Sequence, residues 1–129
     1  LVGLDFSKNM LALARKKITS KKVTFISADL NEKWPVNDNS FDLATINLTL
    51  EHIKILDHIF NSLFIKLTKG GKCFVCELHP EKQLAGSKAR FQDNGTEIVL
   101  DVFQHSELDY VQSAEKAGFS LLVQQLLRA

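Results

Sequence analysis

Two acidic side chains, each following a short apolar run, are the best candidates in this sequence for binding a small ligand. Asp5 closes the run at residues 1–5, and Asp29 follows the run at residues 23–27. Short runs rich in Val, Ile and Phe predict β-strands, and neighbouring strands lie roughly 4.8 Å apart. If these strands pair in parallel, both carboxylates reach the carboxyl edge of the sheet, where ligands of open α/β sheets bind. One nucleoside-sized ligand could then contact both.

The chemistry of an ionised carboxylate suits this task, because it is acceptor-only and has two oxygens. Asp5 could accept hydrogen bonds from two ribose hydroxyls, and Asp29 from an adenine amine. Phe6 and Leu30 could cover the faces of the base, although either could equally belong to the core. A structural role is open for both acids. Asp5 could stabilise the dipole of a helix starting at Lys8, and Asp29 could be a turn residue.

The elements around these acids alternate between strand and helix. Ser7 is a suitable N-cap for a helix with Met10, Ala14 and Ile18 on one apolar stripe and Leu11 beside it. A strand is predicted at residues 41–46, and an amphipathic helix at residues 53–67. We expect Gly70-Gly71 to end that helix in a left-handed C-cap, before a buried strand at residues 72–78.

The remainder of the chain has a less regular pattern. Residues 81–95 are polar and predict a loop or lid, and residues 97–103 predict an added strand. Ser106 is expected to cap a last helix that ends at Gly118, followed by a final strand at residues 119–127. Alternation of this kind predicts a doubly wound α/β fold with a mostly parallel sheet. We therefore expect one domain, residues 1–129, with a variable segment at about 79–105.

Composition narrows the classes of function. The 129 residues are 45% hydrophobic and 24% charged, with a formal net charge of +1. With so small a net charge, the protein has no overall electrostatic field that would attract nucleic acid or a membrane surface. No apolar run is long enough to span a membrane, so a cytoplasmic location is expected. A basic cluster at residues 15–22 is interpreted as a solvated helix end. Cys73 and Cys76, three apart on a strand, point to opposite faces, which favours buried core thiols over a metal site.

Several segments, taken in order, resemble the class I S-adenosylmethionine-dependent methyltransferases, which have a Rossmann-like fold. They are VGLDFS at 2–7, FISAD at 25–29, SFDL at 40–43, LTKGGK at 67–72 and EKAGF at 115–119. The resemblance implies that S-adenosylmethionine is the cofactor and that a small molecule accepts the methyl group. It also implies that Asp5 holds the ribose, that Asp29 and Leu30 lie by the adenine, and that Asn47 and Leu48 line the cofactor. Phe6, Ser7 and Met10 belong to the same cofactor-binding segment.

The acceptor side is less defined. A base is needed only if the acceptor must first lose a proton, and the candidates are His52, His79 and His105. Each could equally be a surface or capping histidine. His79 is also a candidate for substrate binding, together with Arg90, which could bind an acidic or aromatic acceptor or simply be solvated.

The sequence departs from the family at both ends. The first strand and its glycine-rich loop would lie in about 30 residues upstream of Leu1, and the family's usual last strand would follow Ala129. We therefore expect a longer gene product, and a homodimer through unpaired sheet edges is one expectation for the chain as given. Two other functions stay open: a non-catalytic binding module of the same fold, and half of a nicotinamide-dependent oxidoreductase.

Overall fold

A computed structural model describes residues 1–77, 90–93, 96–99 and 102–124. Their contacts divide the chain into two compact units, Leu1–Asn37 and Asp38–Ala129, and each unit is described by itself. A single domain over residues 1–129 stays a prediction.

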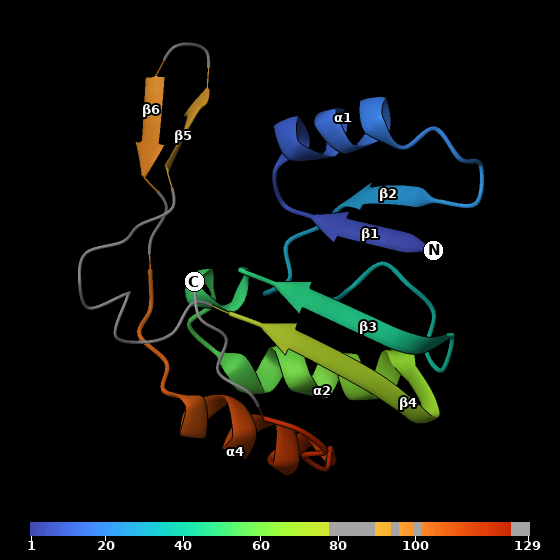
Figure 1. Cartoon of the computed structure of the whole chain (residues 1–129), viewed down its shortest axis with the longest axis vertical. Coiled ribbons are helices and arrows are strands. Elements are labelled where there is room, and N and C mark those ends of the chain that lie inside the picture. Colours follow the sequence, from blue (N-terminus) through green and yellow to red (C-terminus); the bar gives the residue numbers. More distant parts are fainter. Residues whose placement is uncertain (78–89, 94–95, 100–101, 125–129) are drawn as a thin grey trace. The chain divides into compact units, whose positions relative to one another are not determined.

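The first unit is a β-α-β arrangement. Strands β1 (Val2–Asp5) and β2 (Thr24–Ser27) pair in parallel, with Val2 opposite Thr24 and Asp5 opposite Ser27. Helix α1 (Lys8–Lys17) connects them and packs against both (Figure 1). Its N-cap is Ser7, whose hydroxyl accepts a hydrogen bond from the Met10 N–H at 3.2 Å, as the sequence predicted. The parallel pairing brings the two strand ends to one edge.

The apolar stripe predicted for α1 is wrong at two positions, Met10 and Ile18. Leu11 is the buried residue of the helix, whereas Met10 is 55% exposed. Ile18 lies beyond the helix, in extended backbone, and is also exposed. Successive helical residues are turned by about 100° around the axis, so a helix that buries Leu11 turns Met10 away from the strands.

The second unit contains a longer parallel pair covered by a helix. Strand β3 (Phe41–Asn47) pairs with β4 (Leu67–Cys76), and helix α2 (Leu56–Lys66) connects them after the 3₁₀ turn η1 (Leu50–His52) (Figure 1). Alternation along β3 leaves Ile46 buried and Leu43 exposed. The core of this unit comprises Ile46, Leu50, Ile53, Leu56, Ile59, Phe60, Leu63 and Leu67.

The predicted role of Gly70-Gly71 as a helix cap is wrong. Helix α2 already ends at Lys66, and Leu67 is extended and belongs to β4. Gly70, with φ +81°, lies inside β4 where the register shifts relative to β3. A Cβ on Gly71 would lie 2.9 Å from the Thr68 carbonyl oxygen. The two glycines therefore permit an irregularity in a strand rather than the end of a helix.

Helix α4 (Glu107–Ala117) packs on α2. It begins at a capping box between Ser106 and Asp109 and ends at Gly118, as predicted. Gly118 has φ +118°, and Phe119 after it makes edge-to-face contacts with Phe60 and Phe64. The C-terminal end of α4 is thus fixed to α2 by aromatic packing.

Three other predicted elements differ from the structure. Strand β5 (Arg90–Asp93) lies inside the predicted loop at residues 81–95 and pairs antiparallel with β6 (Thr96–Val99). Strand β6 starts one residue before the predicted added strand, and residues 102–103 are in no strand. Residues 119–124 form no strand either, and Phe119 packs on α2 instead. Residues 125–127 of that prediction, and Leu78 of the predicted strand at 72–78, lie outside the described residues.

The cysteines of β4 are only partly as predicted. Both are free, and Cys73 is half-buried, but Cys76 is exposed at the end of the strand. Burial raises the pKa of the Cys73 thiol to about 11. Residues three apart on a strand face opposite sides, which explains why the two thiols have different surroundings.

Replacing Gly118 by alanine should destabilise the second unit. A Cβ there would lie 2.7 Å from Cε2 of Phe64, in addition to the strain of a positive φ. Gly70→Ala is the matched control, because Gly70 also has a positive φ but a Cβ added to it would meet no atom within 4 Å. We expect Gly70→Ala to cost about 1–2 kcal/mol and Gly118→Ala clearly more, as measured by urea unfolding. Equal costs would contradict the proposed packing at Phe64.

Candidate functional site

The carboxyl edge of β1 and β2 carries both predicted acids. Asp5 is the last residue of β1 and lies opposite Ser27, the last residue of β2. Asp29 follows two residues after Ser27. The Ala28 N–H donates to the Asp5 carbonyl oxygen at 2.9 Å, so the two chain segments stay joined past the strand ends. Both acid side chains are half-buried. The edge therefore presents two carboxylates from adjacent parallel strands, as the sequence predicted.

Each carboxylate also holds the turn that follows it. Oδ1 of Asp5 accepts from the Ser7 N–H at 2.8 Å, and Oδ1 of Asp29 accepts from the Asn31 N–H at 2.9 Å and from the Asn31 side chain at 3.0 Å. These hydrogen bonds make Asp29 a turn residue, as considered, and join Asp5 to Ser7, the N-cap of α1; an interaction of Asp5 with the helix dipole stays a prediction. The hydrogen bonds involve one oxygen of each carboxylate and orient the side chain, which is compatible with ligand binding through Oδ2.

Apolar groups lie along the same stretch of chain as the acids. Phe6 is 73% exposed and Met10 is 55% exposed, while Leu30 is half-buried. An aromatic ring this exposed contributes little to a core. Anionic acceptors beside exposed apolar groups fit a nucleoside, which has a diol, an exocyclic amine and a flat apolar face.

In the second unit, the carboxyl end of β3 leads into an unusual turn. Asn47 ends the strand, and both Asn47 and Leu48 are exposed. Leu48 has φ +50°, in the left-handed region that side chains with a Cβ rarely occupy. Such conformations persist only where the surroundings impose them, and they concentrate at functional sites.

Glu77, directly after β4, binds this turn. Its Oε1 accepts from the backbone N–H groups of Thr49 at 3.0 Å and Leu50 at 2.8 Å. The other oxygen, Oε2, is buried without a hydrogen-bond partner among the described residues. Burial raises the pKa of Glu77; Glu51 raises it further, whereas the two backbone hydrogen bonds and His52 lower it.

A small group of polar side chains surrounds Glu77. Glu51 is buried, and one of its oxygens lies 3.4 Å from Nε2 of His52. Tyr110 of α4 has a buried hydroxyl without a partner among the described residues. Burial, followed by the nearby acids Glu77, Glu51 and Asp109, raises the pKa of Tyr110 to about 12. Tyr110 therefore stays protonated at neutral pH, and its hydroxyl can donate a hydrogen bond as well as accept one.

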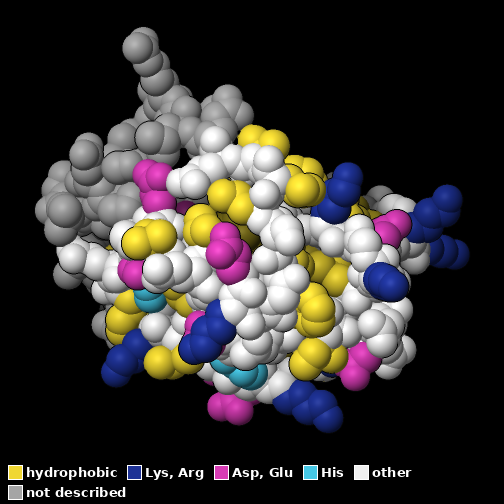
Figure 2. All heavy atoms as spheres, turned by 90° about the horizontal axis from the view of Figure 1, so that it is seen from below, with side chains coloured by type: hydrophobic (Ala, Val, Ile, Leu, Met, Phe, Trp, Pro, Cys, Tyr) yellow, Lys and Arg dark blue, Asp and Glu magenta, His cyan; other side chains and the backbone are white. Residues whose placement is uncertain are grey.

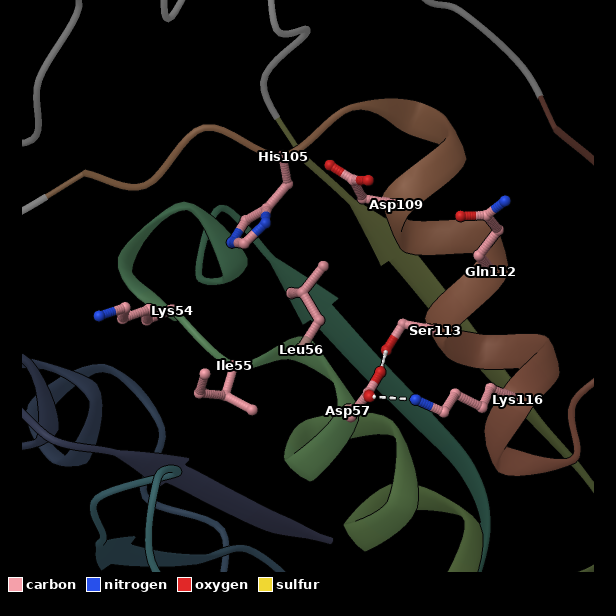
Figure 3. Close-up of a pocket in the computed structure, with 9 residues that line it drawn as sticks. All are labelled: Lys54, Ile55, Leu56, Asp57, His105, Asp109, Gln112, Ser113 and Lys116. Atoms are coloured by element: carbon pink, nitrogen blue, oxygen red, sulfur yellow. Dashed lines mark hydrogen bonds and ion pairs between the residues drawn. The ribbon is translucent and has the colours of Figure 1, made fainter.

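A groove of about 400 Å³ lies between the start of α2 and one face of α4 (Figure 3). Asp57 bridges its two sides, accepting from the Ser113 hydroxyl at 2.6 Å and from the Lys116 ammonium at 2.9 Å. These bonds lower the pKa of Asp57, the Ser113 bond most. The groove is lined by Lys54, Ile55, Leu56, Asp57, His105, Asp109, Gln112, Ser113 and Lys116. Its mixed charges favour neither an anion nor a cation.

The histidine candidates have different positions. His52 belongs to η1, beside Glu51, and His105 lines the groove with its Nε2 at 2.5 Å from the Ile53 carbonyl oxygen. His79 lies outside the described residues, and Arg90 belongs to β5, whose side chains are not described. No group of three potential metal ligands occurs among the residues that the structure describes.

Sequence reasoning missed Glu77, although a usable signal was present. Glu77 lies near the end of the apolar run predicted as a strand at residues 72–78, and an acid at the end of such a run marks a strand end in the same way as Asp5. Glu51 and Tyr110 had no such signal, because their proximity depends on the packing of η1 and α4 in three dimensions.

Comparison with known proteins decides the family. A family model described as a methyltransferase domain matches residues 1–75. This chain belongs to that methyltransferase family. The match covers both parallel strand pairs almost to the end of β4, and with them both acids and the Leu48 turn.

Relatives of the methyltransferase chain include both sequences and solved structures. It is 36% identical over 78 residues to a demethylmenaquinone methyltransferase of Shouchella clausii, covering 59% of this chain and 33% of that protein. It thus spans about a third of the length of such curated relatives. A structure of an S-adenosylmethionine-dependent methyltransferase from Mesorhizobium loti is similar with a TM-score of 0.75 at 22% identity, covering 92% of this chain and 62% of that one. The fold is therefore the Rossmann-like methyltransferase fold.

The same fold occurs with another activity. The [4+2]-cyclase SpnF is similar with a TM-score of 0.67 at 22% identity, covering 95% of this chain and 44% of that one.

Within the described part of this methyltransferase chain, the helices are all too short or too polar to cross a membrane. On the face drawn in Figure 2, Lys and Arg side chains are dispersed among acidic and hydrophobic ones.

The raised pKa of Glu77 predicts a specific pH dependence of stability. The folded state holds the Glu77 proton more tightly than the unfolded state, so stability falls as pH rises from the usual glutamate value of 4.5 through the raised pKa. Glu77→Gln cannot ionise and should lose this decline. Urea unfolding at a series of pH values measures it, with Glu115→Gln, on an exposed residue of α4, as the control. A parallel pH profile for Glu77→Gln and the parent protein would contradict the prediction.

Proposed function

We propose that this chain forms the cofactor-binding part of an S-adenosylmethionine-dependent methyltransferase that acts on a small molecule. Membership of the methyltransferase family supports this. The observation that carries it furthest is the parallel, in-register pairing of β1 and β2, which presents Asp5 and Asp29 at one edge. Antiparallel strands would have separated the two acids to opposite ends of the pair.

In this proposal each acid recognises one part of the adenosine. Asp5 accepts hydrogen bonds from the ribose hydroxyls, and Asp29 accepts one from the adenine amine, with Leu30 beside the base. Phe6 and Met10 supply exposed apolar surface, and Ser7 orients the start of α1. A cofactor-lining role for Asn47 and Leu48 is part of the same proposal.

Methyl transfer requires little covalent chemistry from the protein. The sulfonium of the cofactor is a strong methyl donor, so catalysis consists chiefly of aligning the acceptor with the S–CH₃ bond. A general base is needed only for an acceptor that must lose a proton. His52, His79 and His105 remain the candidates for it, and His79 and Arg90 remain candidates for holding the acceptor.

The acceptor that we propose to test first is a quinone in its reduced, hydroxylated form. The support is the name of the relatives, demethylmenaquinone methyltransferase, together with an identity of 36% to one of them. A reduced quinone is a flat, electron-rich ring whose hydroxyl can lose a proton to a base.

Asp5→Ala should weaken binding of the product S-adenosylhomocysteine by about 1–3 kcal/mol, since charge-assisted hydrogen bonds to the ribose are lost. Isothermal titration of the full-length protein measures this. Asp5→Asn sharpens the test, because its carbonyl oxygen can still accept from the Ser7 N–H. If Asp5 binds ribose, the Asn variant should also bind weakly. If it only holds the turn, the Asn variant should bind like the parent.

Further titrations separate the competing functions. A protein that binds NAD and does not bind S-adenosylhomocysteine would indicate the oxidoreductase alternative. Binding of S-adenosylhomocysteine without methyl transfer to any acceptor would indicate a binding module. It would also be compatible with a different reaction, because a [4+2]-cyclase has the same fold.

A further inference from the structure

We infer that Glu77 is a positioning residue that holds the turn at Leu48 in its cofactor-binding conformation. The inference rests on the proposed function, because the cofactor role of Asn47 and Leu48 is part of it. It concerns only residues within the second unit.

The turn needs an external restraint because its backbone is strained. Leu48 has φ +50°, and a branched apolar side chain gains nothing locally from this conformation. Leu48 is also 58% exposed, so burial of its side chain does not impose the conformation. The restraint must come from the backbone groups on either side.

The end of β4 supplies that restraint by accepting hydrogen bonds from three consecutive N–H groups of the turn. The Leu48 N–H donates to the Cys76 carbonyl oxygen at 2.9 Å, and the next two N–H groups, of Thr49 and Leu50, donate to Oε1 of Glu77. The Thr49 hydroxyl closes the turn from the other side, donating to the Asn47 carbonyl oxygen at 2.9 Å. Glu77 thus provides the only side chain among the described residues that binds the N–H groups of both Thr49 and Leu50.

The state of Glu77 argues against a role in packing alone. A carboxylate with one buried oxygen that has no partner among the described residues is costly, and an apolar residue would fill the same space at lower cost. Residues that break a local rule in this way usually serve a functional arrangement. The hydrogen bonds from the Thr49 and Leu50 N–H groups and the nearby His52 offset only part of this cost, because burial and the acidic Glu51 leave the pKa of Glu77 raised. The Tyr110 hydroxyl makes no hydrogen bond among the described residues.

Four variants of the full-length protein test the inference through binding of S-adenosylhomocysteine. Glu77→Ala removes both acceptor bonds and should raise Kd by about 10- to 100-fold. Glu77→Gln keeps an acceptor oxygen at the same reach and should stay within about 3-fold of the parent. Glu77→Asp keeps the charge but is one methylene shorter and should raise Kd at least about 5-fold. Tyr110→Phe, which removes the neighbouring hydroxyl without touching the turn, is the matched control and should leave Kd unchanged.

Hydrogen exchange provides a readout that does not depend on the cofactor. The amides of Thr49 and Leu50 should exchange faster in Glu77→Ala and Glu77→Asp than in Glu77→Gln. If Glu77→Ala fails to fold, the comparison of Glu77→Asp with Glu77→Gln carries the test.

The outcomes separate this inference from the proposed function. A parent protein that does not bind S-adenosylhomocysteine refutes the proposed function. A parent that binds it, with Glu77→Asp and any folded Glu77→Ala binding equally well, refutes the positioning role alone. Rescue by Gln but not by Asp supports the inference, because charge is then less important than the reach of the acceptor oxygen.

Discussion

Carboxylates at the ends of parallel strands satisfy backbone N–H groups that the strands leave without partners. Asp5 binds the Ser7 N–H, Asp29 binds the Asn31 N–H, and Glu77 binds those of Thr49 and Leu50. A strand that ends must return its chain through a turn, and the donors of that turn need acceptors. Asp5 and Asp29 supply such acceptors to the turns after their own strands, whereas Glu77, one residue past β4, supplies one to the turn after the neighbouring strand β3. Within each unit, the acidic side chain at a strand end therefore also holds the backbone of a turn beside it.

The sequence was most informative where local signals and three-dimensional contacts agree. The Ser7 and Ser106 caps, the left-handed end of α4 at Gly118 and the parallel pairing of β1 with β2 follow from residue types and alternation. Gly70-Gly71 was misassigned because a glycine pair after an amphipathic helix is compatible both with a helix C-cap and with an irregularity in a strand. Only the register of β4 against β3 distinguishes them. Met10 was misassigned because α1 has apolar residues on more than one side. Which side packs on the strands depends on the three-dimensional position of the helix, and in the structure Leu11 is the residue that is buried.

The candidate site was predictable to a similar extent. The acids of the first unit could be found because each lies at, or shortly after, the end of a recognisable strand. Glu77 follows one as well, but the nearby His79 has the more obvious acid–base chemistry. The contact between Glu77 and the turn at Leu48 joins residues 27 and 28 positions apart, which no local pattern predicts. Family membership adds the cofactor hypothesis but leaves the reaction open, since a [4+2]-cyclase shares the fold.

The exposure of Cys76 has a chemical consequence. A thiol must ionise to react with electrophiles or oxidants, and at neutral pH the half-buried Cys73, with its pKa of about 11, is almost entirely un-ionised. Oxidising or alkylating agents will therefore reach Cys76 first. Its carbonyl oxygen accepts from the Leu48 N–H and its neighbour in the chain is Glu77, so a bulky adduct on this sulfur would stand next to the left-handed backbone at Leu48. The chain carries a natural attachment point for a spectroscopic label at the place where the strand end and the turn meet.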